Sequence, residues 1–201
     1  MSSADGVDTQ GLTWLWRNRW PDCPPVADWL RGVYPHWWVR FHSLPGSKRY
    51  ADDDDEYRII LERHNAVLTE LDVGRTLLVI TCDWTTTPEP PDLRTPQLYR
   101  LDPAGVHWQT ILYDDSGDAP ELPVYAQLYA SGRQWTVGVV DDLLRSVADD
   151  ELAGVILAPK DLTWLYHPYD GGADVLLPDQ YQRDALKARH RAWLSGHPAG
   201  M

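Results

Sequence analysis

The clearest pattern in the chain is an apolar stripe across residues 52–72. Its members recur at three- and four-residue steps, as on one face of a helix: Tyr57, Ile60, Leu61, His64, Leu68 and Leu71. Four aspartates stand at the start of this segment, where the helix dipole favours negative charge, and Gly74 follows its end. The pattern predicts a long helix over about residues 52–72. A second long helix is expected at about residues 178–194, and shorter helices at 12–19, 26–31 and 141–148.

Other segments have the pattern of strands. Residues 77–81 are continuously apolar, which indicates a central strand, while residues 106–113 alternate between apolar and polar positions. Residues 124–130 and 134–140 flank Ser-Gly-Arg and predict a hairpin. Further short strands are expected at residues 37–41, 155–157, 162–166 and 175–177. Together they predict an α+β fold with one mostly antiparallel or mixed sheet and the two long helices packed on it. A mixed α/β arrangement stays open.

The length predicts one domain. The 201 residues are enough to form a core without disulfides or metals. We expect a disordered leader over residues 1–10 and one globular domain over residues 11–201. The Thr- and Pro-rich stretch 85–96 is too short to join two domains, and residues 114–123 are expected to form a turn-rich loop.

Charge limits the class of partner. Thirty acidic residues against eighteen basic ones give a net charge of −12. This disfavours nucleic acids and anionic membranes and favours a basic protein partner. The polar start of the chain does not resemble a signal peptide, and no apolar run is long enough to span a bilayer. These features predict a cytoplasmic protein, and the preference for Arg over Lys suggests a bacterial source with a high-GC genome.

The chain has two cysteines, Cys23 and Cys82, and no Cys-x-x-Cys motif. This excludes a zinc site built from cysteines. One disulfide is conceivable, but two buried free thiols are favoured because nothing else marks the chain as secreted. The Gly-x-Ser-x-Gly and dinucleotide-binding motifs and a His-x-x-x-His pair are also missing. We therefore expect no cofactor and assign no catalytic or metal-binding residue.

Two segments carry candidate ligand-binding residues. The first is the most cationic stretch of the chain and could hold a phosphate or carboxylate; its candidates are Arg40, His42, Lys48 and Arg49. The alternative is a surface loop whose cations pair with the aspartate run that follows. This run is also the candidate surface for a basic partner, or a solvated helix start: Asp52, Asp53, Asp54 and Asp55.

The second segment combines an imidazole, a phenol and two carboxylates: His167, Tyr169, Asp170 and Asp174. These groups could form a metal site or supply acid–base chemistry. They could equally be turn and cap residues. His64 lies on the helical stripe, so a buried structural histidine is favoured there over a general base.

The segment from Tyr169 to Val175, with the tail Trp193-Leu194-Ser195, resembles an uncharacterised bacterial family, a domain of unknown function. Members of that family pair a Tyr-Asp-x-x-x-Asp-hydrophobic segment with a helix that ends in Trp-Leu. They also share the upstream order of an aromatic strand with an arginine, a long helix and an apolar strand. The resemblance draws attention to Arg40, Tyr169, Asp170 and Asp174, and it implies no activity.

Two functions follow from these observations. We favour a non-enzymatic acidic interaction protein, of the immunity or antitoxin type, that binds a basic partner. The alternative is a small-molecule or metal-binding enzyme that uses residues 40–49 and 167–174. Only the alternative requires the two segments to meet in one pocket.

Overall fold

The computed structural model describes residues 6–71, 73–113 and 123–195. Within these ranges seven strands form one sheet in the order β1-β7-β6-β5-β2-β4-β3, and every neighbouring pair is antiparallel. The strands are β1 (Trp38–His42), β2 (Thr76–Thr85), β3 (Val106–Tyr113), β4 (Val124–Gln134), β5 (Ile156–Pro159), β6 (Leu165–Tyr169) and β7 (Gly172–Leu176). The apolar stretch at residues 77–81 lies in β2, which is central as predicted.

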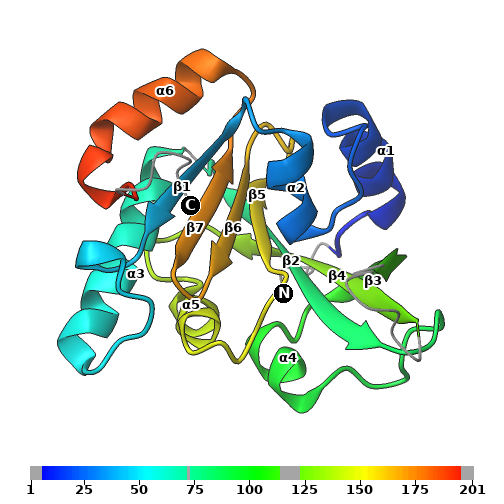
Figure 1. Cartoon of the computed structure of the whole chain (residues 1–201). Coiled ribbons are helices and arrows are strands. Elements are labelled where there is room, and N and C mark those ends of the chain that lie inside the picture. Colours follow the sequence, from blue (N-terminus) through cyan, green and yellow to red (C-terminus); the bar gives the residue numbers. More distant parts are fainter. Residues whose placement is uncertain (1–5, 72, 114–122, 196–201) are drawn as a thin grey trace.

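Helices cover both faces of the sheet (Figure 1). They are α1 (Thr9–Arg19), α2 (Ala27–Val33), α3 (Asp54–Glu70), α4 (Pro96–Leu101), α5 (Asp141–Ala148) and α6 (Gln180–Arg189), with short 3-10 turns η1 (Pro45–Ser47) and η2 (Arg191–Trp193). The α+β class is confirmed. Helix α6 is shorter than predicted, because the chain turns at His190 into η2. Helix α4 was not predicted, since its six residues carry no extended apolar pattern.

The sheet separates two apolar cores. On one face, α1 and α2 pack Trp16, Trp20 and Leu30 against Ile80 and other side chains of the central strands. On the opposite face, α3, α5 and α6 pack against the residues that alternate with them along the same strands. We refer to these as the α1–α2 face and the α3–α5 face.

The N-terminal tryptophans mostly serve the α1–α2 core. Trp16 and Trp20 are each 3% exposed, and their indole N–H groups donate to the carbonyls of Cys23 and Leu162. Trp14 points outward and is 67% exposed. Both cysteines are buried and free, as favoured from the sequence.

The predicted hairpin at residues 131–133 is wrong. Strand β4 runs straight through, with Gly132 opposite Leu78 of β2. None of the three residues has the positive φ that tight hairpin turns require. The Ser131 hydroxyl instead donates to the buried carboxylate of Asp102 at 2.6 Å, which satisfies a polar group inside the strand.

Other predictions fall at the edges of the described structure. Residues 1–5 of the expected leader and residues 114–122 of the expected loop lie outside the described residues. Helix α1 begins at Thr9, and the Asp8 carboxylate caps its first turn. None of the described helices has the length and hydrophobicity needed to cross a membrane.

Candidate functional site

A polar row crosses three neighbouring strands at the β1 side of the sheet. The register places Arg40 of β1 opposite Asp174 of β7, and Asp174 opposite His167 of β6. The next row contains His42, Gly172 and Tyr169. Segments more than 120 residues apart in sequence are thus brought side by side by strand pairing.

The row lies on the α1–α2 face. Leu165 and Leu176 lie two residues from His167 and Asp174 and so share their face of the sheet, and both belong to the α1–α2 core. The polar row therefore continues this face where its apolar packing ends. The intervening Val39 and Val175 point into the opposite core.

The Arg40–Asp174 pair anchors the row. The Arg40 Nε and Nη2 groups donate to the two carboxylate oxygens of Asp174 at 2.7 and 2.8 Å. The Asp174 side chain is 4% exposed and that of Arg40 12%, so the charges are largely removed from water. Burial alone would lower the pKa of Arg40, but the Asp174 carboxylate outweighs it and raises the pKa. The Tyr169 ring packs against the guanidinium, with its centroid 4.5 Å away.

A second arginine–carboxylate pair closes one side of the site. Arg49 Nε donates to Asp170, and the Tyr50 hydroxyl donates to the same carboxylate oxygen at 2.9 Å. Asp170 is buried, whereas the Arg49 side chain is 63% exposed. The loop between β1 and α3 is therefore tied to the turn between β6 and β7.

Glycine is required at the centre of the second row. A Cβ at Gly172 would lie 2.0 Å from the Phe41 carbonyl oxygen, a distance that no side chain tolerates. The lack of a side chain at Gly172 therefore lets β7 approach the β1 backbone closely.

Two histidines face this space in neutral form. His167 Nδ1 donates to the Val155 carbonyl at 2.9 Å, which leaves Nε2 as an acceptor. Burial lowers the pKa of His167. Burial, followed by the nearby Arg40 charge, also lowers the pKa of His42. His42 Nε2 is buried without a hydrogen-bond partner among the described residues.

Helix α2 borders the same space with Asp28 and Arg31, and η1 contributes Ser47. Together these elements enclose a hollow of about 450 Å³. We call it the arginine hollow, and its polar lining consists of Asp28, Arg31, Arg40, His42, Ser47, Arg49, His167, Tyr169, Asp170 and Asp174. Burial raises the pKa of Tyr169 to about 12, so its phenol stays protonated at neutral pH.

The hollow joins most, but not all, of the residues named from the sequence. Lys48 is directed elsewhere: its ammonium group contacts Asp52 and Glu56. Asp28 and Arg31 were not anticipated. Their three-residue spacing places them on one side of a helix, but only the tertiary structure shows that this side meets β1 and β7.

The four aspartates at the start of α3 are placed apart from the hollow. Asp53 caps α3 by accepting from the Glu56 N–H. The other three pair with cations, Asp52 with Lys48, Asp54 with Arg145 and Asp55 with Arg58, while remaining 83–97% exposed.

A metal centre finds no support in the part of the chain described by the structure. It contains no group of three or more His, Cys, Asp or Glu side chains that could hold one ion. Asp170 and Asp174, which the sequence offered as ligands, are both bonded to arginines.

His64 lies on the opposite face, away from the hollow. Its Nδ1 contacts the Tyr166 hydroxyl at 2.6 Å, and its Nε2 contacts the Ser43 hydroxyl at 3.2 Å. Burial lowers the pKa of His64 to about 4. Both ring nitrogens are occupied, which fits a structural histidine.

Removal of Arg40 should destabilise the protein strongly. The variant Arg40→Met leaves the Asp174 carboxylate buried and unpaired, which should lower the free energy of unfolding by about 3–5 kcal/mol. The double variant Arg40→Met/Asp174→Leu should recover most of this loss. Urea unfolding measures both, with Arg58→Met as a surface control that should change the free energy of unfolding only slightly. A loss of that small size for Arg40→Met would contradict the structural role of the pair.

The buried His64 should make stability depend on pH. Between pH 6.5 and 4 the unfolded chain binds a proton at His64 that the folded protein excludes, so stability falls as the pH falls. From pH 7.5 to 5 this contribution is about 2 kcal/mol. The variant His64→Gln should be less stable at pH 7.5 but should lose about 2 kcal/mol less over this range. Other histidines cancel in the comparison, and equal pH slopes in urea unfolding would refute the assignment.

The comparison with protein families supports the resemblance to a domain of unknown function. A family model described as a domain of unknown function, DUF3885, matches residues 26–198, which include the whole lining of the arginine hollow. Helix α1 precedes the matched region. No curated protein and no solved structure was found to match. Because the match covers most of the length of this chain, the chain belongs to the DUF3885 family.

Proposed function

We propose that this protein binds a small molecule carrying a phosphate or carboxylate group in the arginine hollow. The observation that carries the proposal is the meeting of the segments around Arg40–Arg49 and His167–Asp174 in one hollow. The acidic interaction function favoured from the sequence does not require this meeting, whereas a ligand site does.

The hydrogen-bond inventory favours an oxyanion. Arg40 donates Nε and Nη2 to Asp174, and Arg49 donates Nε to Asp170. These bonds hold each guanidinium in place and leave its remaining N–H groups for a ligand. Arg31 is exposed and has no carboxylate partner among the described residues. Planar guanidinium groups held in this way are suited to bidentate recognition of phosphate or carboxylate.

In this proposal the buried carboxylates of Asp170 and Asp174 orient the guanidinium groups of Arg49 and Arg40. Their charges are matched by arginines, so they do not present free negative charge to the hollow. The neutral His167 offers an acceptor at Nε2, which could take a proton from a bound molecule. His167 is accordingly the candidate for acid–base chemistry if the domain is an enzyme.

Ligand binding should raise thermal stability. We expect the melting temperature to rise with inorganic pyrophosphate or citrate, because a ligand of the folded state adds about 2.7 kcal/mol at a hundredfold excess over its Kd. Arg31→Met, at an exposed position without a carboxylate partner among the described residues, should reduce the shift without unfolding the protein. Arg58→Met on the opposite face should keep it. The absence of any shift, or the same shift in all variants, would refute the proposal.

The acidic interaction protein remains the second candidate. It is supported by the net charge of −12 and by the exposure of Asp52, Asp54 and Asp55 at the start of α3. Their partners Arg58 and Arg145 are themselves about half exposed or more, so a basic protein could replace them. The two free, buried thiols support the cytoplasm as its location.

A pull-down from host lysate tests the second candidate. We expect a single basic protein in stoichiometric amount, released as salt rises because exposed charges are screened. Substitution of Asp52, Asp54 and Asp55 by Asn should abolish its capture, while Asp161→Asn, a distant exposed control, should not. Capture that resists both salt and these substitutions would exclude the aspartate surface.

A further inference from the structure

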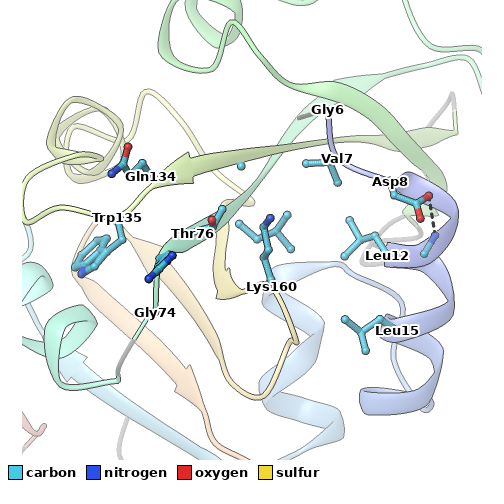
Figure 2. Close-up of a pocket in the computed structure, with 14 residues that line it drawn as sticks. Gly6, Val7, Asp8, Leu12, Leu15, Gly74, Thr76, Gln134, Trp135 and Lys160 are labelled. Carbon is cyan, nitrogen blue, oxygen red and sulfur yellow. Dashed lines mark hydrogen bonds between the residues drawn. The ribbon is translucent and has the colours of Figure 1, made fainter. Parts of the chain in front are cut away.

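A larger hollow lies at the opposite end of the strands on the same α1–α2 face (Figure 2). Its volume is about 930 Å³, and it lies between α1 and the ends of β2, β4 and β5. Its lining shares no residue with the arginine hollow.

Small side chains on the sheet create this space. Leu78 of β2 is flanked by Gly132 of β4, which lines the hollow, and by Ala158 of β5, which is fully buried in the core. The missing bulk therefore lies on the Gly132 side. Gly132 pairs within the ladder but has no β3 partner, because the β3–β4 pairing ends at Ala130. The surface of the sheet therefore leaves a space beneath the first turns of α1.

Part of the wall of the hollow is apolar, while Thr76 and Gln134 add polar groups to it. In Figure 2, Leu12 and Leu15 point from α1 toward the space. Leu12 and Leu78 are 6% and 4% exposed, and Val7 adds further apolar surface. Trp135 borders the hollow but packs against the α3–α5 core. A ligand would gain by burying an aliphatic or aromatic body here.

The rim carries positive charge. Arg75 and Lys160 are exposed, and neither has a carboxylate partner in the described part of the chain. The register continues Lys160 beside Thr76, so both cations lie at the same end of the sheet. The acidic side chain among the lining residues, Asp8, already accepts from the Gln10 and Gly11 N–H groups at 3.1 and 3.0 Å.

We infer that this hollow is a second binding site, for an amphiphilic anion with an apolar body and a carboxylate, sulfonate or phosphate head. The apolar part of the wall takes the body, and Arg75 and Lys160 take the head. The ligand is a free small molecule, because a chain with a net charge of −12 is repelled from anionic bilayers.

Paired fluorescent probes test both parts of the inference. The anion 8-anilinonaphthalene-1-sulfonate carries a sulfonate that the neutral N-phenyl-1-naphthylamine lacks. Both should bind the native protein with saturating fluorescence. Arg75→Ala and Lys160→Ala should each weaken the sulfonate probe about threefold and leave the neutral probe unchanged. Lys187→Ala, on α6, is the matched control and should affect neither.

A filling variant locates the apolar body. Leu15→Trp should abolish binding of both probes while circular dichroism shows an intact fold. The inference is overturned if the sulfonate probe does not bind, if it binds unchanged in the Arg75→Ala/Lys160→Ala double variant, or if Leu15→Trp binds as the wild type does. Pyrophosphate stabilisation through the arginine hollow should survive in Leu15→Trp, which separates the two sites.

Discussion

The pairing of β1 with β7 is the constraint on which the rest of the candidate site depends. It places Arg40 opposite Asp174, two charges that must meet because they lie among buried groups. A slip of one residue would turn Arg40 toward the α3–α5 core and Val39 toward the hollow. The ion pair therefore selects the register, and the register brings the loop with Arg49 to the turn with Asp170. The geometry of the candidate site and the register of β1 with β7 therefore have one physical origin.

The same strands serve a core and a hollow because their two faces carry different patterns. On the α3–α5 face, Val39, Val175 and Tyr166 remain apolar and buried to the ends of the strands. On the other face the apolar side chains give way to Arg40, His167 and Asp174. Helix α2 covers this transition, with Leu30 in the core and Arg31 at the hollow. Because Leu30 and Arg31 are adjacent on α2, the packing of Leu30 in the core also fixes where Arg31 lies at the hollow.

The sequence revealed local structure better than long-range placement. The helix at residues 141–148 and the strand at residues 106–113 have periodic patterns that identify them directly. The turn expected at Gly132 failed because Ser-Gly-Arg is typical of turns only when no buried partner such as Asp102 holds it extended. Most residues of the arginine hollow could be named from their chemistry, but their meeting could not. It depends on pairing between strands separated by more than a hundred residues, which leaves no periodic signal.

The two hollows flank one core, and this arrangement explains their different chemistry. Tyr166 pairs with Leu157, so β6 reaches Tyr169 at the arginine hollow while β5 reaches Lys160 at the other end. Between them, Trp16, Trp20, Leu30 and their neighbours fill the α1–α2 face. At the β1 side the sheet supplies charged rows, so the hollow there is polar and its arginines are held by carboxylates. At the β4 side it supplies Leu78 and Gly132 beside Thr76 and Gln134, so the hollow there is partly apolar and its cations stand at the rim. The side chains on the strands beneath each hollow thus determine its chemistry. The packed tryptophans lie between the two hollows.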